Sequence, residues 1–308
     1  MKIVTKLRNE FRQKILKLPT QVVLEPTNRC NLNCPYCMVG VHTKLVAEHG
    51  SAAHEYMHRP QGCMDEETFF AVMRHLKQFG ILKVYLHFQG EPFLNPLLPR
   101  FARILKSNRF NVGVFTNGMA LHGKNIQEIA DAEVDLIRFS VDGATNVSYA
   151  QNRVGGNFER VFENMRLTAL AHRGKATRIE WQFLALRNNE HEIEQAQALA
   201  QKIGVHFFVK GFRDTDTELN PRNARFQAQF LKKPCKDIYR QLGIYWNGDV
   251  VPCCYDTDAS EVMGNVVKNS LMDIWNSPKY REFRSRVDNA LTRPQAEPDI
   301  CKACLRWR

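Results

Sequence analysis

Three cysteines, Cys30, Cys34 and Cys37, lie within eight residues in the spacing Cys-x3-Cys-x2-Cys. Thiols this close together either converge on one soft metal centre or remain as separate reduced thiols. A structural zinc ion takes four protein ligands, and the nearest candidate for a fourth is His42. An iron–sulfur cluster held by three cysteines needs no fourth protein ligand, provided that another group takes the last iron. The spacing alone favours iron–sulfur and leaves zinc open.

The remaining cysteines form a second group near the C-terminus. Apart from the isolated Cys63, they are Cys235, Cys253, Cys254, Cys301 and Cys304. Nine cysteines bunched in this way do not resemble the disulfide framework of a small secreted protein. The first residues also lack the continuous apolar segment of a secretory signal. We therefore expect a cytoplasmic protein in which clustered cysteines bind metal.

The composition narrows the class of protein further. A chain of 308 residues can bury a full core, and α/β barrels of this length commonly form one domain with an appendage. No window approaches eighteen consecutive apolar residues, so no transmembrane helix is predicted. The net charge of +11 suits nucleic acid, but the lysines and arginines are scattered and no aromatic-flanked basic motif accompanies them. We therefore expect no nucleic-acid partner.

The apolar pattern predicts alternating strands and helices after an N-terminal amphipathic helix over residues 1–19. The expected helices include Glu66–Phe79 and Glu190–Ile203. The expected strands are Val22–Leu24, Lys83–Phe88, Val112–Phe115, Leu136–Ser140, Arg178–Leu184 and His206–Lys210. Such alternation indicates parallel strands joined by right-handed crossovers. Six units are too few to close an eight-stranded barrel, so the prediction is an open, partial (β/α)6 barrel over residues 20–212.

Three further segments complete the predicted organisation. Residues 38–63 interrupt the first unit and are interpreted as an inserted, solvent-facing lid, and residues 213–232 as a polar linker. A small C-terminal domain over 233–308 begins with a hairpin, for which Asn247 and Gly248 predict a type I′ turn. A helix then follows from Leu271, with Ser270 as its N-cap.

Short polar stretches follow the predicted strands, where barrels place their chemistry. They are Gln89–Pro92, Thr116–Gly118 and Ser140–Gly143. Together with the three-cysteine loop, in this order, they resemble the radical S-adenosylmethionine (radical SAM) superfamily over residues 20–210. The resemblance implies a 4Fe–4S cluster on the three cysteines, with SAM bound to its free iron. It also implies an external one-electron reductant, of flavodoxin or ferredoxin type, and reductive cleavage of SAM to a 5′-deoxyadenosyl radical.

The same resemblance suggests which residues contact SAM. Gly90, Glu91 and Pro92 match the segment that meets the SAM amino group, and Gln89 stands beside them. Ser140 and Arg153 match the pair that holds the SAM carboxylate, for which a guanidinium is well suited. Tyr36 is expected on the adenine side. Ordinary packing remains the alternative for Tyr36, and a surface position for Arg153.

The C-terminal cysteines resemble a SPASM or twitch domain. That resemblance implies one auxiliary 4Fe–4S cluster on Cys235, Cys253, Cys301 and Cys304, because the extra downstream cysteines of a two-cluster domain are missing. Cys254 is spare and could replace Cys253. Zinc on the same four thiols is the alternative.

The resemblance, with its single auxiliary cluster, implies a radical SAM oxidoreductase acting on a small polar substrate, such as a sugar or cyclitol alcohol. Peptide maturation is the alternative, although only about twenty residues precede the first strand, too few for a fused leader-binding domain. A non-enzymatic RNA-binding or electron-carrier protein is a third. Period-2 alternation gathers polar side chains on one face of each strand. We interpret that face as the inner one, because Gln89 is expected at the SAM site. The resulting candidates for substrate contact are His87, Glu180, Gln182 and Lys210.

Overall fold

The computed structural model describes residues 18–49, 57–212, 218–227, 235–290, 292–302 and 304. Nearly all of the helix expected over residues 1–19 lies outside this part of the chain, as does half of the expected linker, residues 213–217 and 228–232. Within the described residues, no helix is both long enough and apolar enough to cross a bilayer.

Nine strands form one curved sheet in the order β6-β5-β4-β3-β2-β1-β7-β8-β9. The first six pair in parallel with their neighbours. They are β1 (Gln21–Leu24), β2 (Lys83–Leu86), β3 (Asn111–Thr116), β4 (Leu136–Ser140), β5 (Arg178–Leu184) and β6 (His206–Lys210). The bounds of β4, β5 and β6 match the expected runs. Strand β1 begins one residue earlier, β3 is one residue longer at each end, and β2 ends two residues earlier. The predicted α/β fold with an open parallel sheet is confirmed.

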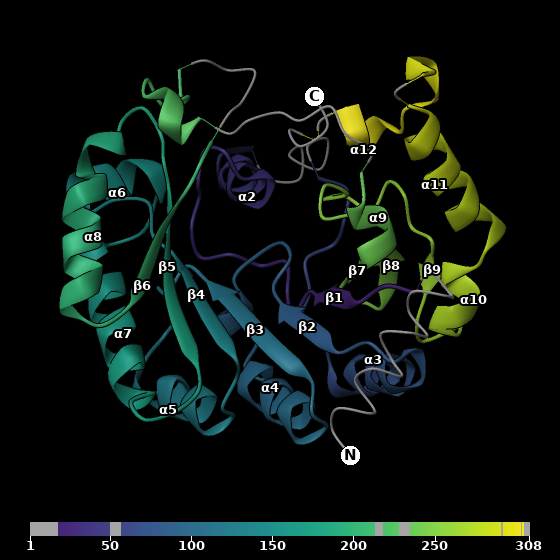
Figure 1. Ribbon diagram of the computed structural model, residues 1–308, viewed down its shortest axis with the longest axis horizontal. Coiled ribbons are helices and arrows are strands. Elements are labelled where there is room, and N and C mark those ends of the chain that lie inside the picture. The colour runs from purple at the N-terminus through teal and green to yellow at the C-terminus, as the bar shows by residue number, and fades with distance from the viewer. Residues whose placement is uncertain are drawn as a thin grey trace.

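Helices cover the outer face of this curved sheet, and the inner face looks onto the middle of the molecule (Figure 1). Helix α3 spans Glu66–Phe79, as predicted, because Asp65 accepts a hydrogen bond from the Thr68 amide and Gly80 ends the helix at φ 72°. The other helices of this half are α4 (Leu98–Ser107), α5 (Gly123–Asp131), α6 (Asn146–Asn152), α7 (Phe158–Ala171) and α8 (Ile193–Lys202), with short 3-10 turns at Pro92–Leu94 and Glu190–Glu192.

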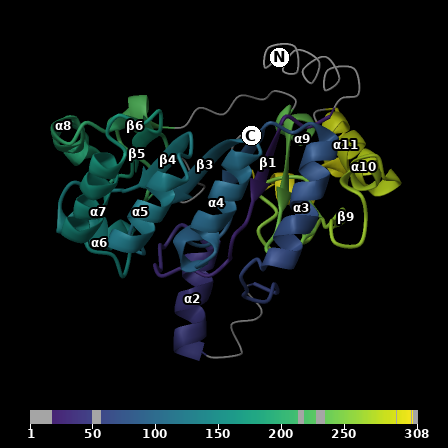
Figure 2. The ribbon, with the colours of Figure 1, turned by 90° about the horizontal axis from the view of Figure 1, so that it is seen from below.

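The expected lid over residues 38–63 consists of two different parts. Residues Met38–His49 form helix α2, which projects beyond the body of the barrel (Figure 2). Residues 57–63 face solvent only in part: His58, Pro60 and Gln61 are exposed, whereas Met57, Arg59 and Gly62 are buried. Arg59 is buried, donates to Glu25 at 2.5 and 3.1 Å, and lies 3.3 Å from the centre of the Tyr245 ring. This segment therefore connects the end of β1 with the C-terminal part of the chain.

The C-terminal part extends the barrel sheet. Strand β7 (Gln241–Ile244) pairs in parallel with β1, and β8 (Asp249–Val251) and β9 (Gly264–Asn265) follow as antiparallel neighbours. The helices beside them are α9 (Asp237–Arg240), α10 (Leu271–Trp275), α11 (Pro278–Asn289) and α12 (Asp299–Lys302). As predicted, Ser270 caps α10 by accepting from the Asp273 amide.

The predicted hairpin between β7 and β8 is present, but its type I′ turn is wrong. The Gly248 amide donates to the Tyr245 carbonyl at 2.9 Å, so Trp246 and Asn247 are the central residues of the turn. Asn247 is not among the residues with positive φ, whereas Gly248 has φ 87°. This is a type I turn followed by a left-handed glycine, the second common hairpin arrangement.

Candidate active site

A cavity of about 620 Å³ opens on the inner side of the curved sheet. It brings together ten of the residues singled out from the sequence: Cys30, Cys34, Cys37, His87, Gly90, Glu91, Ser140, Arg153, Gln182 and Lys210. Four other candidates do not line it: Tyr36, Gln89, Pro92 and Glu180. Because the lining comes from the carboxyl ends of parallel strands and from the cysteine loop, the cavity lies where such folds carry their chemistry.

The three cysteines occupy the loop between β1 and α2. Close approach of α2 fixes this loop, since a Cβ on Gly40 would lie 2.5 Å from the Cys34 amide nitrogen. Burial raises the pKa of the Cys30 thiol to about 12, and also raises that of Cys34. Neutral thiols in such surroundings become thiolates only when a positive centre binds them. The donor set therefore fits a metal cluster.

Glu91 links the ends of β2 and β3. Its carboxylate accepts from the Thr116 hydroxyl and from the Asn117 amide, both at 2.6 Å. Burial raises the pKa of Glu91 to about 7, although these hydrogen bonds act in the opposite direction. The preceding Gly90 has φ 74°, and a Cβ there would lie 2.5 Å from the Arg29 carbonyl oxygen. Only glycine lets this segment pass so close to the cysteine loop.

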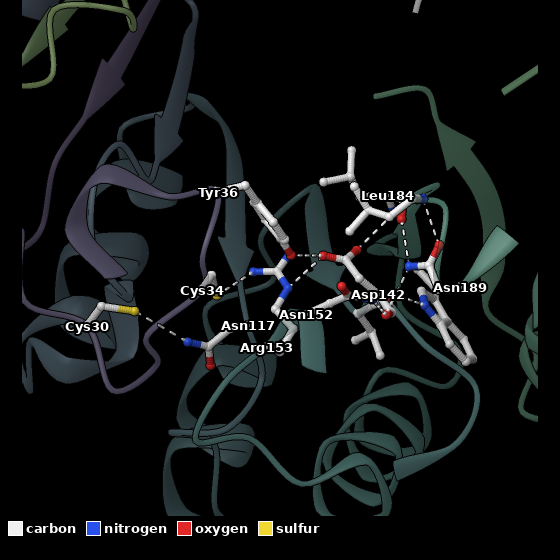
Figure 3. A network of polar contacts seen from close by, with 12 residues as sticks. Cys30, Cys34, Tyr36, Asn117, Asp142, Asn152, Arg153, Leu184 and Asn189 are labelled. Atoms are coloured by element: carbon white, nitrogen blue, oxygen red, sulfur yellow. Dashed lines mark hydrogen bonds and ion pairs between the residues drawn. The ribbon is translucent and has the colours of Figure 1, made fainter. Parts of the chain in front are cut away.

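Asp142 anchors Arg153 at the edge of the cavity (Figure 3). One carboxylate oxygen accepts from Arg153 Nε at 2.7 Å and from the Tyr36 hydroxyl at 2.6 Å. The other accepts from the Leu184 amide at 2.8 Å. Burial would lower the pKa of Arg153, but the adjacent carboxylate holds it well above its usual range. Tyr36, expected on the adenine side of SAM, thus serves in this structure to hold the arginine's partner.

Arg153 and Asn117 connect this network to the cysteines. Arg153 Nη1 lies 3.8 Å from the sulfur of Cys34, and Asn117 Nδ2 lies 3.8 Å from the sulfur of Cys30 (Figure 3). N–H groups directed at sulfur stabilise negative charge on it. These two residues are thus suited to support thiolates that hold a cluster.

The polar side chains expected to meet substrate divide into two sets. His87, Gln182 and Lys210 face the cavity. Glu180 does not line the cavity. The residue is buried, and its carboxylate accepts from Arg138 and Arg178, each at 2.8 Å. Burial lowers the pKa of His87 to about 3, and the charges of Arg138 and Lys210 contribute. His87 is therefore neutral at pH 7.

The C-terminal cysteines gather beside this cavity. Burial raises the pKa of Cys301 to about 12, and the electrostatic influence of Cys304 and Cys235 adds to this shift. Cys253 shares a hydrogen bond with Cys254, which raises the pKa of Cys253 well above its usual range, and it is also influenced by Cys304. Of the four thiols expected to hold an auxiliary cluster, Cys301 is thus influenced by Cys304 and Cys235, and Cys253 by Cys304. Cys254 differs from them, because its side chain lines the central cavity.

A site for a single metal ion differs from a cluster site, because its ligands must all converge on one atom. In the described part of the chain, no group of three or more His, Cys, Asp or Glu side chains is placed to hold one ion. His42, the candidate fourth zinc ligand, is buried on α2, and its Nδ1 has no hydrogen-bond partner there.

Comparison with known families agrees with this geometry. Residues 24–177 match the model of the radical SAM superfamily, and residues 235–305 match SPASM, an iron–sulfur cluster-binding domain. The chain belongs to the radical SAM superfamily. Membership implies SAM and 4Fe–4S clusters as cofactors.

Individual radical SAM relatives differ in what they act on. The PqqA peptide cyclase of Gluconobacter oxydans is 24% identical over 94% of this chain and 83% of its own length. The S-adenosyl-L-methionine-dependent 2-deoxy-scyllo-inosamine dehydrogenase of Niallia circulans is 22% identical over 94% of this chain and 93% of its own. Among solved structures, Streptococcus suis SuiB bound to S-adenosylmethionine has a TM-score of 0.71 at 14% identity, covering 97% of this chain and 75% of SuiB.

Sequence reasoning did not single out two residues of this radical SAM site. Asp142 lies in the turn stretch after β4. It is eleven residues from Arg153 in the sequence, and this spacing does not indicate that the two side chains are in contact. Arg138 also lines the cavity, although it is not among the predicted site residues. A charged residue inside a predicted central strand is costly to bury, and this was the signal available for Arg138.

Proposed function

We propose that the protein oxidises an alcohol of a small polar, sugar- or cyclitol-like substrate by radical SAM chemistry. The observation that carries the proposal is the single cavity lined by Cys30, Cys34 and Cys37 and also by His87 and Gln182. A volume of about 620 Å³ is in the range of small-molecule pockets. Once SAM is bound, the remaining space suits a small polar molecule.

The ligand assignments belong to this proposal. Cys30, Cys34 and Cys37 would hold the SAM-binding 4Fe–4S cluster. Cys235, Cys253, Cys301 and Cys304 would hold a second one. When bound, the first cluster and SAM supply a radical that removes a hydrogen atom from carbon, and the second supplies a one-electron acceptor.

The chain's own residues bind and orient the two substrates. The Glu91 carboxylate can accept from the SAM amino group, and Arg153 together with the Ser140 hydroxyl can hold its carboxylate. Neutral His87 can accept a hydrogen bond from a substrate hydroxyl, and Gln182 can accept or donate one. Ser140 and Gln182 lie opposite each other in the paired strands β4 and β5, which favours precise positioning of the reacting carbon.

The test is an isotope experiment. Anaerobically reconstituted enzyme is incubated with SAM, dithionite and a panel of carbon-deuterated sugars and cyclitols. We expect deuterium in 5′-deoxyadenosine, together with a ketone product. SAM cleavage without deuterium transfer from any alcohol on the panel would contradict the assigned substrate class, though not the family.

Peptide modification is the second candidate, and the relationship to the PqqA peptide cyclase supports it. The same reaction with deuterated peptides in place of sugars separates the two. Deuterium transfer from a peptide, with a new cross-link or a mass change in that peptide, would favour the second candidate.

A further inference from the structure

Arg138 projects from β4 into the central cavity between two aromatic rings. Its guanidinium carbon lies 4.4 Å from the centre of Phe115 and 4.9 Å from the centre of Phe208, and all three side chains line the cavity. A planar guanidinium stacks well on aromatic faces, and such stacking fixes its orientation. The group is therefore held in place before any ligand arrives.

Only one of the three nitrogens of this guanidinium makes a hydrogen bond to a described residue. Nε donates to Glu180 at 2.8 Å, and among the described residues the two terminal nitrogens have no hydrogen-bond partner. Glu180 does not neutralise Arg138 fully, because its other oxygen bonds Arg178 at 2.8 Å. Two guanidinium groups thus share one carboxylate, which leaves positive charge at the cavity wall.

The lining of the cavity adds to this charge. Lys210 belongs to the same wall, and of the described lining residues Glu91 alone carries a carboxylate. The Glu91 carboxylate accepts hydrogen bonds from Thr116 and Asn117, on the side of the cavity proposed to bind SAM. Arg138 and Lys210 both act on His87, which stacks on Phe115 at 4.2 Å between ring centres. The wall around Phe115 thus carries two cations and a neutral imidazole.

We propose that the substrate carries an oxyanion group, either a phosphate or a carboxylate, that binds the terminal nitrogens of Arg138 in a bidentate fork beside Lys210. This arrangement matches the planar geometry in which arginine binds both anions. The inference rests on the proposed function, because it names a substrate group in the same cavity. It predicts that neutral sugars and amino sugars are poor ligands, since an ammonium group would meet like charge.

Binding is tested with four related sugars and two free anions on the reconstituted holoenzyme with SAM. The probes are glucose, glucosamine, glucuronate and glucose 6-phosphate, with acetate and inorganic phosphate at millimolar concentration, measured by isothermal titration calorimetry. We expect at least one anionic sugar to bind about tenfold or more tightly than glucose, and glucosamine more weakly than glucose. Comparison of glucuronate with glucose 6-phosphate separates carboxylate from phosphate.

Substitutions of Arg138 and Lys210 test whether these two residues cause the preference for an anionic sugar. Arg138→Gln should remove the preference for the anionic sugar, and Lys210→Gln, at the end of β6, should weaken it. Glu180 keeps Arg178 in both variants, and circular dichroism checks that they fold. The control Lys202→Gln removes a lysine at the far end of α8, outside the cavity, and should leave the preference intact. The proposal is overturned if no anion binds, or if Arg138→Gln and Lys210→Gln both retain the wild-type preference.

These outcomes are independent of the isotope test. An enzyme that transfers deuterium from a neutral alcohol and ignores every anion would keep the proposed function and lose the anion site. An enzyme that binds an anionic sugar through Arg138 but oxidises none would keep the anion site and lose the proposed oxidation.

Discussion

Arg153 donates from Nε to Asp142 at 2.7 Å while its Nη1 reaches to 3.8 Å from the sulfur of Cys34. The carboxylate thus holds the guanidinium beside the cysteine loop. Nε of the buried arginine is thus fixed by the protein, and Nη1 is directed at the cysteine side of the cavity. The pair thus brings a residue from the loop after α6 next to the loop after β1.

The first prediction concerns SAM affinity. Arg153→Ala removes the charge expected to hold the SAM carboxylate, and Asp142→Asn removes the anchor of that charge. Loss of a contact to a charged group costs about 1.5–3 kcal/mol, so SAM binding should weaken by roughly tenfold to a hundredfold in Arg153→Ala. Equilibrium dialysis with labelled SAM measures it, and the iron content of the N-terminal site should stay unchanged.

A matched control for these variants is Glu163→Gln, which breaks the exposed Glu163–Arg166 pair on α7. Surface pairs contribute little, so this variant should bind SAM as wild type does. If Arg153→Ala also binds SAM with wild-type affinity, the assignment of Arg153 to the SAM carboxylate is wrong.

The second prediction is the metal content. Anaerobically reconstituted protein should contain about eight irons and about eight sulfides per chain, as two cubanes require. The double substitution of Cys301 and Cys304 by alanine should reduce this to about four irons. Elemental analysis and electron paramagnetic resonance measure both values. About four irons with stoichiometric zinc in the wild type would instead assign the C-terminal thiols to zinc.

The third prediction uses the same double variant to test electron transfer. If the auxiliary cluster accepts the substrate's electron, the variant should still form 5′-deoxyadenosine and take up deuterium from substrate, but should yield little ketone. If the cluster only stabilises the fold, as structural metal sites do, the variant should be insoluble or else fully active. A folded variant that turns over at the wild-type rate would exclude the electron-acceptor role.

The fourth prediction concerns pH and His87. An unfolded histidine takes up a proton below about pH 6.5, whereas burial and the cations Arg138 and Lys210 lower the folded pKa of His87 to about 3. The stability from neutral His87 is therefore present above pH 6.5 and is lost as the pH falls towards 3. Since the side chain borders a cavity, we expect a loss of about 1 kcal/mol by about pH 5.5.

Urea unfolding of wild type and His87→Phe at about pH 7.5 and about pH 5.5 measures this loss. Phenylalanine preserves the stacking on Phe115 and cannot titrate. The variant should therefore lose less stability on acidification than wild type, and the comparison cancels any acid lability of the clusters. Equal losses would show that His87 titrates normally.

The fifth prediction concerns the parallel pairing of β7 with β1. A Cβ on Gly243 would overlap the ring of Phe88 and lie 2.9 Å from Val251. Gly243→Val should therefore lower the stability by about 1–3 kcal/mol, because the inner side of β7 cannot move away without losing its pairing with β1. Gly123→Ala is the control, since nothing lies within 4 Å of the added atom. Thermal unfolding should separate the two variants.

The parts of the fold that local patterns determine were predictable. The β-branched runs at Leu136–Ser140 and Arg178–Leu184 became strands with the expected bounds, and Glu66–Phe79 became the expected helix, because periodicity and caps act over a few residues. The hairpin was also predictable, but not its turn type. A glycine after asparagine can occupy either of two left-handed positions, and the flanking residues decide which.

Long-range relationships were not predictable from the residues alone. Nothing in the sequence of β7 indicates that it pairs with β1 rather than lying in a separate domain. The clamp around Arg138 depends on Phe115 and Phe208, which come from two other strands and meet only after the sheet has curved. The polar candidates His87 and Gln182 were found because alternation in a strand reveals its faces. Alternation does not reveal that Glu180 pairs with Arg138 on the neighbouring strand, and Glu180 does not line the cavity.

The position of β1 has a consequence during synthesis on the ribosome. Strand β1 lies between β2 and β7, yet Gln21 and its partner Gln241 are 220 residues apart in the chain. At roughly 5–20 residues per second, on the order of ten to forty seconds pass between the appearance of the two strands. Throughout that interval β1 has one unpaired edge, which can pair with other chains. Codon usage, growth temperature and chaperone supply should therefore govern the soluble yield of this protein.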